Sequence, residues 1–352
     1  MKGLYVCAFE DGGTLSYLND WLDTFASRDF DVFNAMQAGR VDFARICATL
    51  PRYDVIVLGY SCYYGLQGRR HRYLAALSRI SRAVVVGFLQ NEFRNFAEKV
   101  GYFDDFGVDI LVSQLPEPVA REFYVGRTKA RKIVSVYHGL FTGTSIDAKP
   151  HRERRVDIGS RLYDYAAYLG NYGRAVAVPA LLDRLRSEGR FVIDWETDPA
   201  QRFEREDWLN FLAGCRLTIA AEAGSFFIQW NETKRHQINA HQRAAPGVSF
   251  QETYELFLRD DPAHFCGATI SPRHFDAVHA RTCQVLVEGK YNGVLNPGEH
   301  YIELKKDASN LDEVLEKMSD TSLCEDTARR AYDHVIEAHT LDHRVEQLFR
   351  EF

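Results

Sequence analysis

Residues 53–60, YDVIVLGY, form a near-continuous apolar run, and a second run of the same kind, AVVVGFL, occupies residues 83–89. A strand with one face in water alternates apolar and polar side chains. A parallel strand covered by helices on both faces is apolar almost throughout. The two runs therefore predict central strands of a parallel sheet.

The segments around these runs repeat the same strand and helix rhythm. Apolar strand-like runs recur at residues 3–9, 109–115 and 132–137. Between them lie segments with helical spacing, such as residues 15–26, where Leu18, Trp21, Leu22 and Phe25 fall on one face. Repeated strand–helix units predict an α/β fold with a parallel sheet.

A basic, proline-containing stretch at residues 149–155, KPHRERR, interrupts the pattern before it starts again. Such polar stretches are typical of linkers, and 352 residues suit two domains. We therefore expect one domain at residues 1–150 and a second at residues 151–352, whose final helix packs back toward the first. The second half repeats the α/β rhythm, with strands at 191–195, 216–221, 284–287 and 301–304 and helices at 175–187, 311–318 and 325–338.

The composition narrows the class of protein. The formal net charge of −6 disfavours a general nucleic-acid binder. The seven cysteines are scattered and form no CxxC pair, which predicts a cytoplasmic protein without disulfides or structural zinc. No run reaches the roughly 18 apolar residues of a membrane span. No His/Cys ligand cluster is evident, so we expect no metal and no bound cofactor.

Ligands of open α/β sheets bind beyond the carboxyl ends of the strands, so residues there are the candidates for function. In the first half, the adjacent Gly12 and Gly13 allow close approach of a phosphate, or simply make a tight turn. Glu92 can act as a base, or stabilise the start of a helix. His138 suits acid–base catalysis or phosphate binding, or serves the structure.

In the second half, three segments follow strands. Arg161 and Arg174 can hold a diphosphate, or be solvated charges. The turn containing Glu222, Gly224 and Ser225 can accept a nucleotide or a sugar, or be a turn only. Glu288 and Gly289 follow the next strand and can meet the same ligand.

Residues 270–277, ISPRHFDA, carry the most specific signal. Ser271 is a natural N-cap and Pro272 a natural first helical residue. The start of such a helix attracts anions, and Arg273 adds a full positive charge. Asp276 lies one turn further on, where its carboxylate can bind ribose hydroxyls. The cap by itself has a structural explanation; the added Arg273 and Asp276 favour a ligand.

Residues 271–310 resemble the donor half of bacterial group 1-type glycosyltransferases, the GT-B enzymes of surface-polysaccharide synthesis, related to the CgeB-like group. Residues 273–277, with His274 at the variable position, are similar to an R-x-F-E-A element with Asp276 in place of Glu. Residues 222–225 resemble an E-S-G-A turn, and residues 90–92 a Q-D-E element.

The resemblance implies a GT-B fold of two Rossmann-like parallel-sheet domains facing a cleft. It implies a metal-independent, hexosyltransferase-like enzyme with a nucleotide-diphosphate sugar as co-substrate in the second domain and a glycan, lipid-linked or small-molecule acceptor in the first. The E-x7-E spacing of many relatives is absent, because Ala268 stands eight residues before Asp276. The sugar contact and the stereochemical outcome therefore stay open.

Other functions compete with this one. A nucleotide-sugar epimerase or hydrolase can use the same fold, and so can a non-catalytic glycan-binding protein. A dinucleotide oxidoreductase is disfavoured, because no GxGxxG follows the first strand.

The uneven charge suggests a location for the acceptor. Residues 1–155 carry 21 Lys and Arg against 17 Asp and Glu. A lipid-linked acceptor at the inner face of an anionic membrane would explain this excess, although an ordinary solvated surface also explains it. Two groups of basic residues are candidates for such contact: Arg127, Lys129, Arg131 and Lys132, and Arg69, Arg70 and Arg72.

Overall fold

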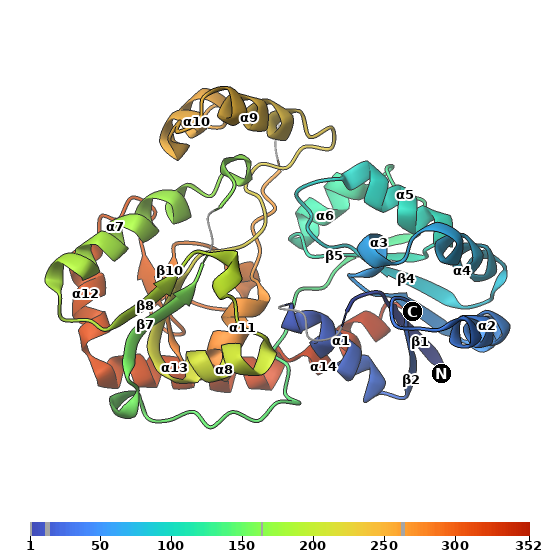
Figure 1. The fold of residues 1–352 in the computed structure, drawn as a ribbon, viewed down its shortest axis with the longest axis horizontal. Helices are drawn as coiled ribbons and strands as arrows, with labels where there is room; N and C mark the ends of the chain where they lie inside the picture. The colour runs from blue at the N-terminus through green and yellow to red at the C-terminus, as the bar shows by residue number, and fades with distance from the viewer. Residues whose placement is uncertain (1, 11–14, 163–164, 262–264) are drawn as a thin grey trace. The chain divides into compact units, whose positions relative to one another are not determined.

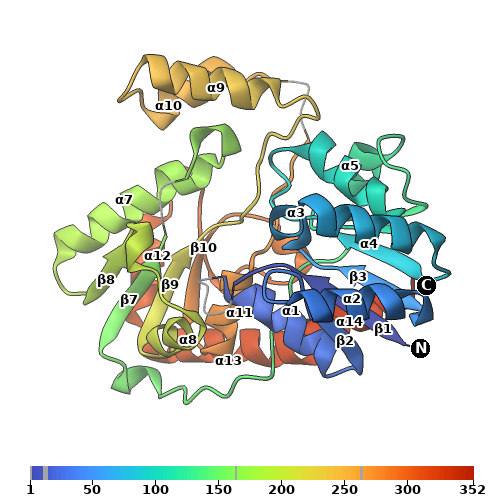
Figure 2. The same cartoon turned by 45° about the vertical axis from the view of Figure 1, so that its right-hand side comes forward.

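The computed structural model describes residues 2–10, 15–162, 165–261 and 265–352. The chain divides into two compact units, one made of residues 1–137 and 341–352 and the other of residues 138–340. Each unit is built on one parallel sheet with helices against it (Figures 1 and 2). Within the described ranges, no helix combines the length and the apolarity that a bilayer span requires.

The first unit contains a six-stranded parallel sheet in the order β2-β1-β3-β4-β5-β6. The two apolar runs that predicted the fold form its central strands β3 and β4, which pair with Val55 opposite Val84. Their side chains are almost all buried, as expected for strands covered on both faces. The strands are β1 (Gly3–Cys7), β2 (Phe30–Asn34), β3 (Val55–Leu58), β4 (Val84–Phe88), β5 (Ile110–Ser113) and β6 (Lys132–Ser135).

The helices of this unit connect the strands and cover the sheet. They are α1 (Ser16–Ala26), α2 (Arg40–Thr49), α3 (Cys62–Gly65), α4 (Gly68–Ile80), α5 (Phe96–Phe106), α6 (Glu117–Tyr124) and α14 (Leu341–Phe349). A short 3-10 helix, η1 (Leu50–Arg52), follows α2.

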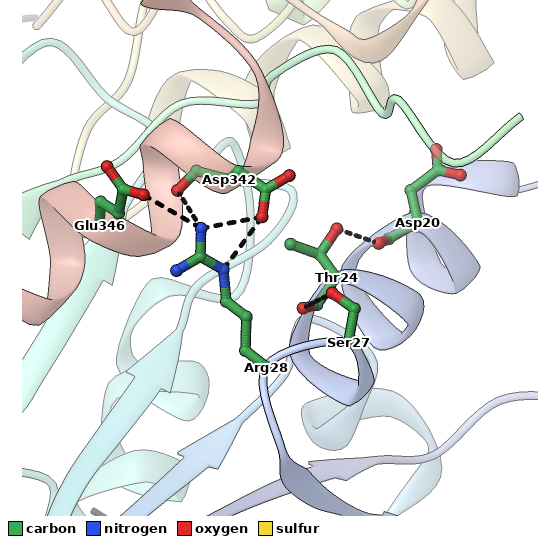
Figure 3. A network of polar contacts seen from close by, with 6 residues as sticks. All are labelled: Asp20, Thr24, Ser27, Arg28, Asp342 and Glu346. Carbon is green, nitrogen blue, oxygen red and sulfur yellow. Dashed lines mark hydrogen bonds and ion pairs between the residues drawn. The ribbon is translucent and has the colours of Figure 1, made fainter.

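The C-terminal helix α14 belongs to the first unit although it follows the second in sequence (Figure 3). The Nη2 of Arg28 donates to Oδ1 of Asp342 at 2.8 Å and lies 3.3 Å from Glu346. Phe349 stacks on Phe30 with 5.8 Å between the ring centroids. These contacts hold the end of the chain against α1 and β2.

The second unit contains a five-stranded parallel sheet in the order β11-β10-β9-β7-β8. Strand β7 lies between β8 and β9, so the chain moves to one side of β7 and then to the other. The point where this order reverses, between β7 and β9, is where open α/β sheets bind ligands. The strands are β7 (Val156–Arg161), β8 (Ile193–Glu196), β9 (Cys215–Ala220), β10 (Cys283–Val287) and β11 (Ile302–Leu304).

The helices of the second unit are α7 (Tyr172–Glu188), α8 (Arg205–Ala213), α9 (Thr233–Ala244), α10 (Phe250–Phe257), α11 (Pro272–His279), α12 (Leu311–Ser319) and α13 (Thr321–Ala338), with 3-10 helices η2 (His151–Glu153), η3 (Ala167–Leu169), η4 (Pro199–Gln201) and η5 (Tyr291–Gly293). Helices α9 and α10 stand apart from the sheet (Figures 1 and 2). They pack on η3 and the start of α7 through Ile238, Leu258 and Tyr254. The sequence pattern had indicated no element there.

The basic stretch at residues 149–155 lies within the second unit, which begins at His138, and two of its residues, His151 and Arg154, are buried. Arg154 is buried, and its guanidinium donates to the carbonyls of Cys215 at 2.7 Å and Ala280 at 3.1 Å. Charged runs are usually solvated, which is why this stretch resembled a linker. Here the arginine satisfies buried backbone carbonyls instead.

Candidate functional site

The start of α7 lies at the reversal point of the second sheet. Asn171 is its N-cap, and its Oδ1 accepts the backbone N–H of Arg174 at 2.9 Å. The Nδ2 of Asn171 donates to the carbonyl of Glu222 at 3.1 Å, which ties the start of α7 to the end of β9. A Cβ on Gly173 would lie 2.5 Å from Val287 and 2.9 Å from Lys306, so the end of β10 and the residues after β11 are adjacent.

The Glu222 carboxylate occupies the centre of this edge. Its Oε1 accepts the backbone N–H groups of Tyr291 at 2.8 Å and Lys290 at 3.2 Å. Burial raises the pKa of Glu222, while these two hydrogen bonds and the ammonium groups of Lys306 and Lys290 lower it. A Cβ on Gly289 would lie 2.6 Å from the carboxylate, so glycine permits the close approach.

The turn after Glu222 is braced by the segment that leads to α11. Gly224 has a φ of +81°, and a Cβ there would lie 2.2 Å from the carbonyl oxygen of Gly267. Ala223 pairs with Thr269 through N–H···O bonds of 2.8 and 3.0 Å. Ser225 is buried, and its carbonyl accepts the N–H of Gly267 at 2.8 Å. Gly224 and Ser225 therefore shape the loop.

The start of α11 is fixed by two polar side chains. Nδ1 of His274 accepts the backbone N–H of Ser271 at 3.0 Å. Burial lowers the pKa of His274 to about 3, so its ring is neutral and serves as a cap. Oδ1 of Asn292, which has a φ of +53°, accepts the N–H of Ile270 at 2.6 Å and the hydroxyl of Thr269 at 2.9 Å. The loop after β10 thus holds the start of α11.

Asp276 and Arg273 lie close together on the first turns of α11. Nε1 of Trp208, on α8, donates to Oδ2 of Asp276 at 3.0 Å. Burial raises the pKa of Asp276 to about 7, against the opposing effects of Trp208, Arg273 and Arg205. The carboxyl group of Asp276 is therefore partly protonated near neutral pH.

Two exposed lysines give this edge a positive charge. Lys290 and Lys306 both lower the pKa of Glu222, so their ammonium groups lie near it. Within the described part of the chain, neither forms an ion pair. Glu288, by contrast, lies 3.7 Å from Lys305, which also pairs with Glu303 at 2.6 Å. Two such lysines beside the N-terminus of α7 form a site suited to an anion.

The guanidinium of Arg161 binds other side chains of the second unit. Its Nη1 lies 2.8 Å from Oδ1 of Asp194, and its guanidinium packs over the rings of Phe203 and Phe211, with centroid distances of 4.8 and 4.3 Å. This pairing satisfies the charge and leaves the guanidinium little freedom to reach a phosphate.

Of the four candidates from the first half of the chain, the structure describes Glu92 and His138. Gly12 and Gly13 lie outside the described residues. Glu92 is buried; Ser113 and Tyr124 donate to its Oε1 at 2.6 and 2.7 Å, and the N–H of Gln114 donates to its Oε2 at 2.6 Å.

Burial raises the pKa of Glu92, and these hydrogen bonds oppose the rise. Its carboxyl group joins the loops after β4 and β5. His138 is buried just after β6, as the first residue of the second unit.

The sequence reasoning missed Asn171, Lys290, Asn292 and Lys306. Asn171 precedes a helix with apolar residues, and asparagine at that position predicts an N-cap. Asn292 precedes a glycine, a pair typical of left-handed backbone. The lysines carried no signal, because isolated lysines are common on surfaces.

Metal ligands do not gather in the described ranges: no three His, Cys, Asp or Glu side chains there come together in a way that could hold an ion. Independence from metal stays a prediction.

Residues 202–350 match the model of a family described as glycosyl transferase-like. No curated protein matches the chain. Among solved structures, HepE of Anabaena in complex with UDP-glucose aligns over 100% of both chains, with a TM-score of 0.53 and 12% identity. An alpha-glucosyltransferase in complex with UDP and DNA aligns over 99% of this chain and 98% of its own, with a TM-score of 0.53 and 10% identity.

These likenesses, together with the two parallel sheets, show that the fold is of the GT-B type. The matched family segment includes α11, β10 and the loop that binds Glu222.

Proposed function

We propose that this protein is a glycosyltransferase that moves a sugar from a nucleotide-diphosphate sugar to a hydroxyl group of a glycan, lipid-linked or small-molecule acceptor. The second unit binds the donor, and the first unit binds the acceptor. The match to a glycosyl transferase-like family model over residues 202–350 supports this activity.

The observation that carries the proposal is the anion site at the reversal point of the second sheet. There Asn171 ties the capped N-terminus of α7 to Glu222, and Lys290 and Lys306 lie near enough to the Glu222 carboxylate to lower its pKa. The helix start and two ammonium groups suit a diphosphate. Beside them, α11 offers Arg273 and the Asp276 carboxyl group for a ribose.

The chemistry at this site is the departure of a nucleoside diphosphate. The bond between the sugar C1 and the diphosphate oxygen breaks, and a bond forms between C1 and the acceptor oxygen. The acceptor hydroxyl loses its proton to a base. Lys290, Lys306 and the start of α7 stabilise the charge that develops on the diphosphate, as preorganised cations do in other transfers. No metal ion has a part in this proposal.

Of the two candidate bases, His138 is preferred to Glu92. Both oxygens of Glu92 already accept hydrogen bonds, so that residue positions its loops. If His138 takes the acceptor proton, His138→Asn lowers kcat about a hundredfold or more and leaves donor affinity unchanged. A structural role would instead lower Tm or donor affinity, and Glu92→Gln, which keeps much of the hydrogen bonding, serves as the control.

The donor assignment is tested by calorimetry with nucleoside diphosphates and their sugars. UDP and UDP-glucose come first, because similar folds were solved with them. Arg273→Ala and Asp276→Ala should each weaken binding about ten- to a hundredfold while leaving the fold intact. Unchanged affinity in both variants would remove α11 from the donor site.

A nucleotide-sugar epimerase or hydrolase is the competing activity, since it needs the same donor site. Product analysis with and without an acceptor separates the two. Transfer yields a new glycoside only when the acceptor is present. Free sugar or an epimer formed without acceptor, at the same rate as with it, contradicts the transferase assignment.

A further inference from the structure

The positive charge of the first unit is concentrated in one segment. Residues 36–82 contain eight arginines against only Asp42 and Asp54, a net charge of +6 in a chain whose total is −6. This segment contains α2, α3 and α4, and α2 and α4 lie next to each other in both views of the fold (Figures 1 and 2).

Helix α4 divides into a buried face and an exposed stripe. Leu74, Ala75 and Ser78 pack into the unit. The opposite side carries the exposed residues Arg69, Arg72, Tyr73, Ala76 and Ile80, which follow one another at helical spacing. Tyr73 is 62% exposed and Ile80 is 77% exposed, unusual values for large apolar side chains. Apolar and cationic groups therefore alternate along one stripe.

The start of α2 continues this composition. Arg70 donates to the carbonyls of Ala35 and Ala38, which fixes the loop before α2 against α4. The next residues include Arg40 and Val41, and Val41 is 81% exposed. We use the name α2–α4 face for a set of exposed residues from the exposed side of α4, the start of α2 and the loop before α2; they are Met36, Arg40, Val41, Arg69, Arg72, Tyr73, Ala76 and Ile80.

The charges of this face differ from those of the other basic group. Arg131 lies 3.4 Å from Asp109, and Lys132 donates to the carbonyl of Glu351. In the described part of the chain, by contrast, no acidic side chain pairs with Arg69 or Arg72. Their charge stays available for an external anionic surface.

We propose that the α2–α4 face docks on an anionic lipid bilayer. Arginines with free guanidinium groups bind lipid phosphates, while tyrosine and aliphatic side chains between them enter the interfacial layer. A nucleic acid would use the arginines but gain little from exposed Ile80 and Val41. This inference goes beyond sugar transfer and does not depend on the donor site.

The test is sedimentation of the full chain with vesicles, without any sugar donor. Wild-type protein should bind vesicles of phosphatidylcholine with about a third phosphatidylglycerol, and not phosphatidylcholine alone. Each basic residue near such a surface contributes about fivefold, so Arg69→Gln with Arg72→Gln should lower the partition coefficient about thirtyfold. Tyr73→Ser with Ile80→Ser should remove the binding that persists at high salt.

The matched control is Lys129→Gln with Arg131→Gln, which removes the same charge from the other basic group and should change binding less than about twofold. Equal losses in the two double variants would show attraction without a defined face and overturn the proposal. So would wild-type protein that ignores anionic vesicles at low salt, or one that binds duplex DNA through Arg69 and Arg72 instead. Sedimentation velocity gives a further outcome that would overturn the proposal. If the wild-type protein is a dimer and Tyr73→Ser with Ile80→Ser makes it a monomer, the α2–α4 face binds a second copy of the chain.

Discussion

The carboxylate of Glu222 accepts the backbone N–H of Tyr291 at 2.8 Å, although the two residues lie 69 positions apart. This bond joins the loop after β9 to the loop after β10 at the edge where two exposed lysines and the start of α7 meet. The shape of the proposed diphosphate site therefore depends on one buried acid.

Glu222→Ala leaves the N–H groups of Tyr291 and Lys290 without their acceptor. We expect a loss of about 1–3 kcal/mol in the free energy of unfolding, measured with denaturant. Glu222→Gln retains an oxygen that can accept, so its loss should be smaller. Equal stability of the alanine variant and the wild type would show that these bonds are replaced without cost.

Asp276 should make stability depend on pH. Burial raises its pKa in the folded protein to about 7, from an ordinary value of 3.8. Between these values the folded protein holds a proton that the unfolded chain has lost, so stability falls as pH rises through that window. Asp276→Asn removes this contribution and keeps an acceptor for Trp208. Denaturant unfolding of both proteins at pH 5 and pH 7.5 measures this contribution. An equal change in unfolding free energy between the two pH values in variant and wild type would contradict the raised pKa of Asp276.

Sugar transfer should persist in excess EDTA. The prediction rests on the sequence, in which no His/Cys ligand cluster is evident. Initial rates with and without chelator test it. Activity lost to EDTA and restored by magnesium or manganese would assign the leaving-group chemistry to a metal.

Arg28→Ala should loosen the C-terminal helix. Its guanidinium binds Asp342 and Glu346 from α14, but both carboxylates are about half exposed, so we expect a loss of only about 1 kcal/mol (Figure 3). Arg45→Ala removes an exposed arginine paired with Asp42 within α2 and serves as the control, with a loss below about 0.5 kcal/mol. Equal losses of unfolding free energy in the two variants would show that the contacts of Arg28 with α14 stabilise the protein no more than an exposed ion pair does.

Much of the fold could be predicted from the sequence, because parallel strands that are buried on both faces are apolar throughout. The runs at residues 53–60 and 83–89 became β3 and β4, and those at 191–195, 216–221, 284–287 and 301–304 became β8, β9, β10 and β11. Helices α9 and α10 were not predicted. Helix α9 is almost wholly polar, and only Ile238 on it is buried, so it shows no apolar face. The burial of Arg154 was not predictable either, because the sequence does not reveal that an arginine in a charged run binds buried carbonyls.

Only part of the candidate site could be predicted from the sequence. Glu222 was a candidate because ligands bind beyond strand ends, and the start of α11 because Ser271 and Pro272 carry a capping signal followed by Arg273 and Asp276. The grouping of Lys290 and Lys306 near Glu222 is a tertiary fact, because β9, β10 and β11 bring these residues together. Likewise, only the structure pairs Arg161 with Asp194.

The central claim is that the second unit binds a nucleoside diphosphate through Lys290, Lys306 and the start of α7. Calorimetric titration of UDP, GDP, ADP and dTDP into wild-type protein and into Lys290→Gln with Lys306→Gln tests it most directly. Lys317→Gln, which removes an ammonium paired with Glu313 on α12, is the control. We predict that at least one nucleotide binds the wild type and the control equally, and the double variant about tenfold or more weakly. Absence of binding by all four, or equal affinity in all three proteins, would contradict the account.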